Sequence, residues 1–333
     1  MGSKLKFEQQ SFGSIVMKRA LTNLRRPQVE SLESRKLMAG DVAVALEGGL
    51  LRIDGDMLDN QIVVAQSTTG DVLVSGQNGT RINGLPSVRF VRPNLNAMEV
   101  RMEGGNDTVT MRSVQLANDL MVDLGAGNDR FVSPASAPMV IGANANIFGE
   151  AGADVVQLSG VTVREDLYID GGIGALNVQL SGVQVDKFMT AVSDEANDVV
   201  SISSSRFGLG ASIETKGGSD RVTMTDVELF ALNINTDANS ALGADVVTLN
   251  RVTTVEDLGI FTGDGNDVVR MTDVTSGKSM VVSLDAGNDQ LIATRVAAAV
   301  DAVFEGGAGV DILTNLGISG GIKREFKEFE ILR

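Results

Sequence analysis

Cysteine, histidine and tryptophan are absent from this chain of 333 residues, and tyrosine occurs once. Without cysteine the chain forms no disulfide. Without cysteine and histidine it lacks the usual zinc ligands, the Ser-His-Asp triad and thiol chemistry. An enzyme built on this sequence would have to use carboxylate or arginine chemistry. The lack of cysteine does not identify a compartment, because disulfide-free proteins occur both inside and outside cells.

Long apolar runs are also missing from the sequence. No stretch approaches the ~18 apolar residues of a transmembrane helix, so we expect no membrane span. The beginning of the chain also lacks the apolar core of about 7–15 residues that marks an ordinary secretory signal. Export would therefore need another kind of signal.

Charge is divided unevenly along the chain. Residues 1–40 contain eight Lys or Arg and three Glu, a net charge of +5, whereas the remainder contains 20 basic and 40 acidic residues, a net charge of −20. Such an acidic body would repel nucleic acid and attract divalent cations, so we expect no nucleic-acid partner. An acidic surface that simply keeps a β-protein soluble explains the same charge.

Aspartate recurs at a regular interval through most of the chain. Successive marks are equally spaced apart from two longer steps, and Leu176 occupies the one mark without aspartate. The nine aspartates are Asp107, Asp129, Asp154, Asp198, Asp220, Asp245, Asp267, Asp289 and Asp311. A regular period of about two dozen residues is typical of a solenoid, in which each repeat packs only on its neighbours.

Within each repeat, apolar residues alternate with polar ones. The residue two positions after the mark is apolar in all ten repeats, and further apolar positions follow four, seven, thirteen and fifteen places after it. This period of two indicates short strands with one buried face. The sequence therefore predicts an all-β, single-stranded parallel β-helix (β-solenoid) of about ten regular coils. Val109, Val156 and Val247 should share one core.

Four segments are expected along the chain. Residues 1–42 form a basic N-terminal targeting or cap segment that is partly disordered or helical, and 43–106 form irregular N-terminal β coils. Residues 107–318 form the regular β-helix, and 319–333 form a C-terminal cap. The two longer coils begin at Asp129 and Asp220, and each is followed by three coils of the standard length. This order suggests a duplicated block of four coils, with three extra residues looping outward from each long coil.

A column of carboxylates needs a compensating interaction. Two charges ~4.8 Å apart repel by roughly 1 kcal/mol in water and by about 3.5 kcal/mol at an effective dielectric of 20. Each aspartate could accept backbone N–H groups in its own turn. Alternatively, the nine aspartates could bind Ca²⁺, which takes about 6–8 oxygen ligands. Further acids lie nearby in the sequence: Asp123, Glu150, Asp170, Asp264, Asp285 and Glu305.

The turns around the marks resemble RTX repeats, whose nonapeptide is Gly-Gly-x-Gly-x-Asp-x-apolar-x. The segment Gly306-Gly307-Ala308-Gly309-Val310-Asp311-Ile312-Leu313 fits the first eight positions, and 125–131 and 263–269 fit most of them. The resemblance implies a Ca²⁺-bound parallel β-roll in a secreted protein. This chain departs from the family because each of its coils has one motif, whereas the shorter RTX coil has two, so a second row of turns is missing.

Residues 25–39 resemble the Leu-Glu-x-Arg-x-Leu-Leu/Met segment that opens many large secreted and surface proteins of planctomycete bacteria. They read Arg-Arg-Pro-Gln-Val-Glu-Ser-Leu-Glu-Ser-Arg-Lys-Leu-Met-Ala. The resemblance implies an extracytoplasmic location. A short basic helix or a disordered tail is the alternative.

The sequence favours a non-enzymatic, extracellular or cell-surface structural or adhesive protein, stabilised by calcium if the column binds it. Its partners would be surface or matrix components, or further copies of itself. A polysaccharide-active enzyme, of the lyase or epimerase kind, is the alternative. An ice-binding face is a third, but Gln157, Gln179, Arg270 and Ile292 interrupt its threonine column.

Six positions after the mark, the late coils alternate in charge. The residues are Asp226, Arg251, Asp273 and Arg295. Opposite charges on neighbouring strands predict a ladder of ion pairs. A catalytic acid–base row is the alternative for these four residues.

Overall fold

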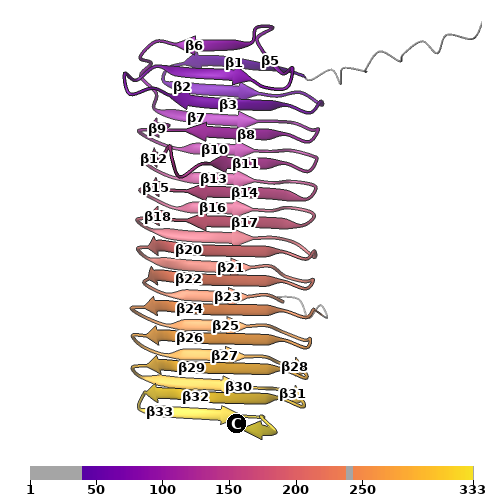
Figure 1. The fold of residues 1–333 in the computed structure, drawn as a ribbon, viewed down its shortest axis with the longest axis vertical. Helices are drawn as coiled ribbons and strands as arrows, with labels where there is room; N and C mark the ends of the chain where they lie inside the picture. The colour runs from indigo at the N-terminus through magenta and orange to yellow at the C-terminus, as the bar shows by residue number, and fades with distance from the viewer. Residues whose placement is uncertain (1–39, 238–242, 333) are drawn as a thin grey trace, which may run out of the picture. The chain divides into compact units, whose positions relative to one another are not determined.

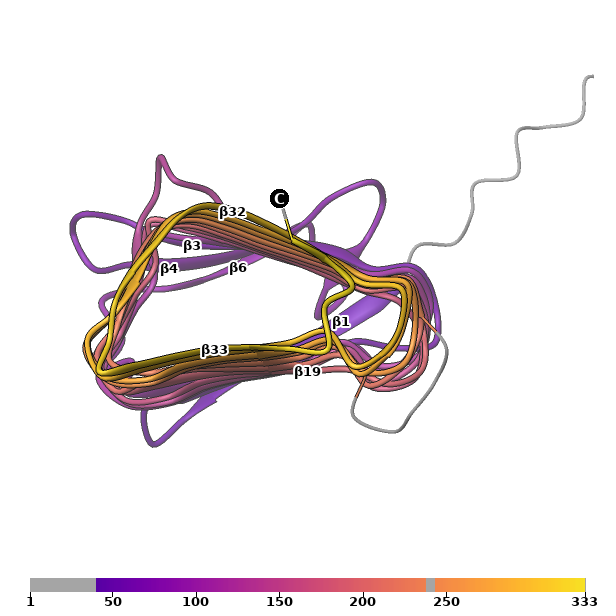
Figure 2. The same ribbon diagram turned by 90° about the horizontal axis from the view of Figure 1, so that it is seen from below.

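Two long, mainly parallel β-sheets face each other through the part of the chain that the structure describes. This computed structural model describes residues 40–237 and 243–332. Each coil passes once through each sheet, and successive coils superimpose when viewed along the stack (Figures 1 and 2). The predicted all-β solenoid of about ten coils is confirmed. Among the described residues there is no helix of the length and apolarity that a bilayer span requires.

The 14-stranded sheet contains, in spatial order, β33 (Lys323–Lys327), β30 (Asp301–Glu305), β27 (Met280–Ser283), β25 (Leu258–Phe261), β23 (Leu232–Asn235), β21 (Gly210–Glu214), β19 (Phe188–Val192), β16 (Leu167–Asp170), β13 (Ala145–Phe148), β10 (Leu120–Asp123), β7 (Ala97–Arg101), β2 (Leu50–Asp54), β1 (Asp41–Glu47) and β5 (Arg81–Ile82).

The main row of the 18-stranded sheet contains β6 (Ser87–Phe90), β4 (Val72–Gly76), β3 (Gln61–Gln66), β8 (Thr108–Arg112), β11 (Arg130–Ser133), β14 (Asp154–Ser159), β17 (Leu176–Ser181), β20 (Val199–Phe207), β22 (Arg221–Leu229), β24 (Val246–Thr254), β26 (Val268–Ser276), β29 (Gln290–Ala298), β32 (Ile312–Gly320) and β34 (Ile331–Leu332). Beside this row lie β9 (Gln115–Leu116), β12 (Met139–Ile141), β15 (Val161–Val163) and β18 (Gln184–Val185). Strands β28 (Ala286–Gly287) and β31 (Ala308–Gly309) form a separate pair.

The core consists of aliphatic columns in which each residue lies over its counterpart one coil earlier. In β24 and β26, for example, Val247 pairs with Val269, and both side chains are fully buried. Val109, Val156 and Val247 belong to one continuous apolar cluster, as predicted. A coil cannot bury this face alone, because its apolar residues need the coils above and below.

The two long coils accommodate their extra residues differently. Between Ser133 and Met139 the first has five residues where the next coil has two, and Figure 1 shows the chain leaving the stack between β11 and β12. The second coil is one residue shorter between β22 and β23 than the next coil is between β24 and β25. It is four residues longer between β23 and Gly243. The predicted placement of three extra residues therefore applies only to the first long coil.

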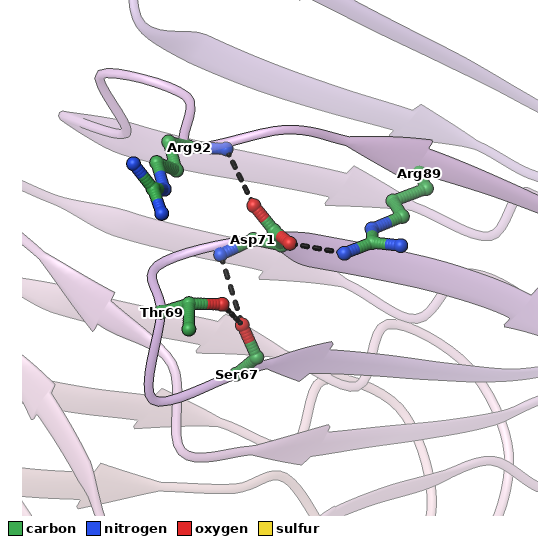
Figure 3. A network of polar contacts seen from close by, with 5 residues as sticks. All are labelled: Ser67, Thr69, Asp71, Arg89 and Arg92. Atoms are coloured by element: carbon green, nitrogen blue, oxygen red, sulfur yellow. Dashed lines mark hydrogen bonds and ion pairs between the residues drawn. The ribbon is translucent and has the colours of Figure 1, made fainter.

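Antiparallel strands flank the first coils, where the sequence suggested irregular coils. Strand β1 pairs antiparallel with β2, and β4 pairs antiparallel with both β3 and β6. Figure 3 shows the polar contacts that join β4 to the segment around β6. Asp71 accepts hydrogen bonds from Arg89 and from the Arg92 backbone N–H (2.9 Å), and its own N–H donates to Ser67 Oγ (3.0 Å). The Arg89 guanidinium lowers the pKa of the Asp71 carboxyl.

At the other end of the stack, β33 extends the 14-stranded sheet. Phe326 pairs with Phe304 in register, and their rings stack with centroids 5.7 Å apart. Phe329 packs against the core. Residues 1–39, which include most of the predicted basic segment and the motif at 25–39, lie outside the described residues.

Candidate functional site: the aspartate column and the recessed corner

All nine aspartates of the column are buried, each with at most 1 % of its surface exposed. They lie at the start of the strands of the 18-stranded sheet, facing inward beside the apolar core. Asp154 and Val156, for example, are both inward residues of β14. The structure therefore brings the predicted residues together in one line, but away from solvent.

Within the column, each carboxylate binds the backbone of the preceding coil. Oδ1 of Asp267 accepts the N–H of Asp245 (2.8 Å), and Oδ1 of Asp289 accepts the N–H of Asp267 (2.7 Å). The same contact occurs for every other aspartate of the column. Backbone bonding of the aspartates is thus confirmed, although the prediction that each bonds within its own turn is wrong.

A second column runs along the surface and bonds in the opposite direction. It consists of the residue before the mark, which is asparagine in five of the ten coils. Oδ1 of Asn266 accepts the N–H of Asn288 in the following coil (2.9 Å), and Asn106 does the same for Asn128 (2.9 Å). A Gly-Asn-Asp turn therefore bonds backward through Asp and forward through Asn. This explains why these two residue types recur together.

Two positions in the stack depart from the aspartate pattern. Leu176 has no carboxylate, and the N–H of Asp154 bonds instead to the Ala175 carbonyl (2.8 Å). At the start of the stack, the N–H of Asn60 donates to Asp107 Oδ1 (2.7 Å), so the column continues one coil earlier than the aspartate period. The regular aspartate period does not reveal this coil, because 47 residues separate Asn60 from Asp107.

Burial raises the pKa of these carboxyl groups, because the charged form loses hydration. The pKa rises from the ordinary 3.8 to about 7 at Asp107 and Asp154 and to about 6 at Asp129. In these three residues Oδ2 has no hydrogen-bond partner among the described residues. In a later coil, Ser193 donates to Oδ2 of Asp198 (2.5 Å). Near neutral pH a share of the column is therefore uncharged, which relieves the repulsion expected between stacked carboxylates.

The donor set of the column does not fit a calcium ion in this arrangement. Oδ1 of each aspartate is already bonded to a backbone N–H, which leaves one carboxylate oxygen per coil against the roughly 6–8 oxygens that Ca²⁺ takes. Within residues 40–237 and 243–332, no group of three or more acidic side chains could hold a metal ion. Three of the nearby acids have other contacts: Asp170 accepts from Tyr168 (3.0 Å), Asp285 accepts from Ser283 (2.7 Å), and Glu305 pairs with Lys327. This arrangement of the column gives no support to calcium binding, which stays a prediction.

Comparison with known proteins adds no relative to this geometry. No family model, curated protein or solved structure matches the chain.

Ion pairs form six positions after the mark in four of the late coils. Arg251 contacts both carboxylate oxygens of Asp226, and Arg295 does the same with Asp273. The charges thus form two separate pairs, whereas the sequence predicted a continuous ladder. In each pair the arginine lowers the pKa of the aspartate carboxyl.

The next corner of the coil, eleven positions after the mark, has similar pairs that were not predicted from the sequence. Lys187 pairs with Glu165, and Lys278 pairs with Glu256. The signal was present, because each lysine occupies the position of its glutamate in the next coil. At both corners the charged side chains form ion pairs between neighbouring coils, as structural ion pairs do.

A recess interrupts the surface where the coil that begins at Asp220 is one residue short. An apolar groove of about 490 Å³ lies near this corner, on the 14-stranded sheet. Phe188, Asn233, Gly259 and Phe261 are among its lining residues. None of them belongs to the repeat pattern, so periodicity gives no signal for this groove.

Proposed function

We propose that this protein is a non-enzymatic structural or adhesive solenoid that acts outside the cell or at its surface. The observation that carries the proposal is that the regularly spaced polar residues of the turns bind neighbouring coils. Aspartates, asparagines and corner charges bond to neighbouring coils along the stack. The recurring polar chemistry of the chain therefore stabilises a long regular body.

The turn sequences and the segment at 25–39 support the extracellular part of the proposal. The turns resemble RTX repeats, and the segment resembles the opening of planctomycete secreted and surface proteins. Both likenesses are to proteins that leave the cytoplasm. Surface or matrix components, or further copies of the chain, are the proposed partners.

Labelling intact cells of the source organism tests this location. A membrane-impermeant amine reagent should modify the protein on whole cells, because lysines such as Lys187 and Lys278 have about half of their side chains exposed (47 % and 54 %). Deleting the gene should then weaken attachment to surfaces or the integrity of the envelope. Labelling only after lysis would contradict an extracellular role.

A calcium contribution to stability is tested by thermal melting with Ca²⁺ and with a chelator. A ligand that binds only the folded state raises the melting temperature as its concentration exceeds Kd. If calcium occupies the turns, 10 mM Ca²⁺ should raise Tm by several degrees over the chelated sample, and Mg²⁺ should not. Equal melting temperatures would remove calcium from the proposal and leave the structural role in place.

A further inference from the structure

The groove on the 14-stranded sheet exists because several outward residues are small. Gly259 takes the outward position that Tyr168 takes four coils earlier in the same column, and Ala231 is another small residue of the lining. The coil that begins at Asp220 is also shortened at the adjoining corner. The surface is consequently hollow over β21, β23 and β25, with a volume of about 490 Å³. This volume lies within the range of about 300–1,000 Å³ that small-molecule sites occupy.

Gly259 makes room for the Phe261 ring in the lining of the groove. A Cβ at this position would stand 2.9 Å from Cε2 of Phe261 and 3.3 Å from Oδ1 of Asn233. The backbone here is not in the left-handed region, so the strand does not itself require glycine. A side chain at 259 would displace the Phe261 ring, which lies against Gly259. What glycine provides at this position is room for that ring.

Aromatic and polar groups surround this volume. Phe188 and Phe261 keep 36 % and 37 % of their surfaces exposed, although solvent is an unfavourable environment for a phenyl ring. Asn233, Asp257 and Ser279 supply amide, carboxylate and hydroxyl groups to the lining. Oδ1 of Asp257 already accepts the N–H of Ser279 (3.0 Å), which fixes the carboxylate at the edge of the groove.

The composition of the lining selects among possible ligands. A sugar ring combines apolar C–H faces, which pack on phenyl rings, with hydroxyls that bond to amides and carboxylates. No Lys or Arg lines the groove, and Asp257 would repel an anionic ligand. A neutral saccharide therefore fits the lining better than an acidic one.

We propose that the groove between Phe188 and Phe261 binds a segment of a neutral polysaccharide. This inference rests on the proposed adhesive function and specifies the chemistry of its partner. Phe261 would stack on a sugar ring, and Asn233 and Asp257 would bond to its hydroxyls. A peptide segment is the other occupant of similar size, and the test separates the two.

Calorimetric titration of the full chain tests the proposal. The probes are cellohexaose, maltohexaose and mannohexaose, with hexagalacturonate as the acidic counterpart. At least one neutral hexasaccharide should bind with Kd below the millimolar range, and hexagalacturonate should bind at least tenfold more weakly. Gly259→Val, which displaces the Phe261 ring, and Phe261→Ala, which removes it, should each weaken binding at least tenfold.

Thr190→Val is the matched control, because Thr190 is an outward residue of the same sheet that does not line the groove. Its affinity should equal that of the unchanged chain. Phe261→Ala keeps the test decisive if Gly259→Val lowers stability. Failure of every neutral hexasaccharide to bind would overturn the inference, and so would groove variants that both bind as tightly as the unchanged chain. Binding of a peptide library that neutral sugars do not displace would also overturn it.

The outcomes also separate this inference from the proposed function. Loss of sugar binding together with labelling of intact cells would overturn the inference alone. Release of shortened sugars or unsaturated products during the titration would overturn the non-enzymatic role, because it would show turnover at the groove.

Discussion

At the scale of single residues, a carboxylate and an aliphatic side chain share the inward face of one strand. In β14, Asp154 and Val156 are both buried, and the alternation of the strand gives them the same direction. The carboxylate is tolerated there because Oδ1 bonds to a backbone N–H of the preceding coil. The aspartate column thus joins coils in the same way as a ladder hydrogen bond, through a side chain.

Replacing one carboxylate tests this role. Asp267→Asn keeps an acceptor for the Asp245 N–H and removes a buried charge, so its melting temperature should match or exceed that of the unchanged chain. Asp267→Ala leaves that N–H without its partner and should lower the free energy of unfolding by about 1–3 kcal/mol. Urea denaturation measures both. Equal stability of the Asn and Ala variants would show that the hydrogen bond contributes little.

The raised pKa values predict how stability depends on pH. In the folded chain the pKa of Asp220, Asp267 and Asp289 is about 7, whereas the ordinary pKa is 3.8. Between these values the folded state holds protons that the unfolded state has released, so stability falls as pH rises. The contribution is fully present below about pH 4 and is lost as the pH passes about 7.

Melting temperatures measured between pH 5.5 and 8.5 check this direction, since the lower limit stays above the sequence pI of about 4.5. We expect Tm to decrease steadily across the range. Asp289→Asn should make the decrease shallower by removing one titrating group. A Tm that increases from pH 5.5 to 8.5 would contradict the buried, partly protonated column.

At the scale of the repeating element, the glycine two positions before each mark determines how closely coils stack. A Cβ at Gly127 would stand 1.6 Å from the carbonyl oxygen of Gly105, and φ at Gly127 is +150°. Backbone atoms cannot move aside as a flexible side chain would. This contact explains why glycine recurs at the position through nine of ten coils.

Gly127→Ala should therefore lower the free energy of unfolding by about 3 kcal/mol or more, within the range of severe single substitutions. Gly48→Ala is the control, because Gly48 has φ of +59° but no atom within 4 Å of its added Cβ. That variant should cost only the strain of a left-handed alanine, about 1–2 kcal/mol. Similar losses in both variants would mean that conformation, and not stacking distance, selects glycine.

The repeating part of the element could be predicted from the sequence, because every coil carries the same pattern. The apolar residues two and four positions after each mark indicated the strands, the inward face and the single core. Burial of the aspartates was also readable, because Asp154 has the same strand parity as Val156 and because Leu176 replaces aspartate at one mark. The direction of the hydrogen bonds was not, since it depends on which neighbouring N–H lies nearest.

The groove could not be predicted for a different reason. It depends on Gly259, Phe261 and Phe188, which occur once each in the pattern, and on a coil that is one residue short at a corner. The longer step from Asp220 to Asp245 concealed this deletion, because four extra residues elsewhere in the coil outweigh it. The pairing register of β23 with β25 is what separates the one-residue shortening before β23 from the four-residue lengthening after it.

At the scale of the whole described stack, the last coils determine whether the edge of the core is covered. Phe304 is fully buried and stacks on Phe326 of β33, whose other residues include Lys323 and Lys327. Charged residues on an outermost strand oppose pairing with another chain. Strand β33 therefore covers an aliphatic surface and presents a charged edge in its place.

Deleting residues 322–333 should convert the protein into one that self-associates. The deletion exposes Phe304 and the unpaired backbone of β30, which is an uncharged template for another strand apart from its end residues. Light scattering after size exclusion should show mass increasing with concentration for the shortened chain and a constant mass for the full one. Phe326→Lys is the informative companion, because it keeps the charged strand and removes only the stacked ring. If the shortened chain stays monomeric at 100 μM, exposure of this edge does not drive assembly.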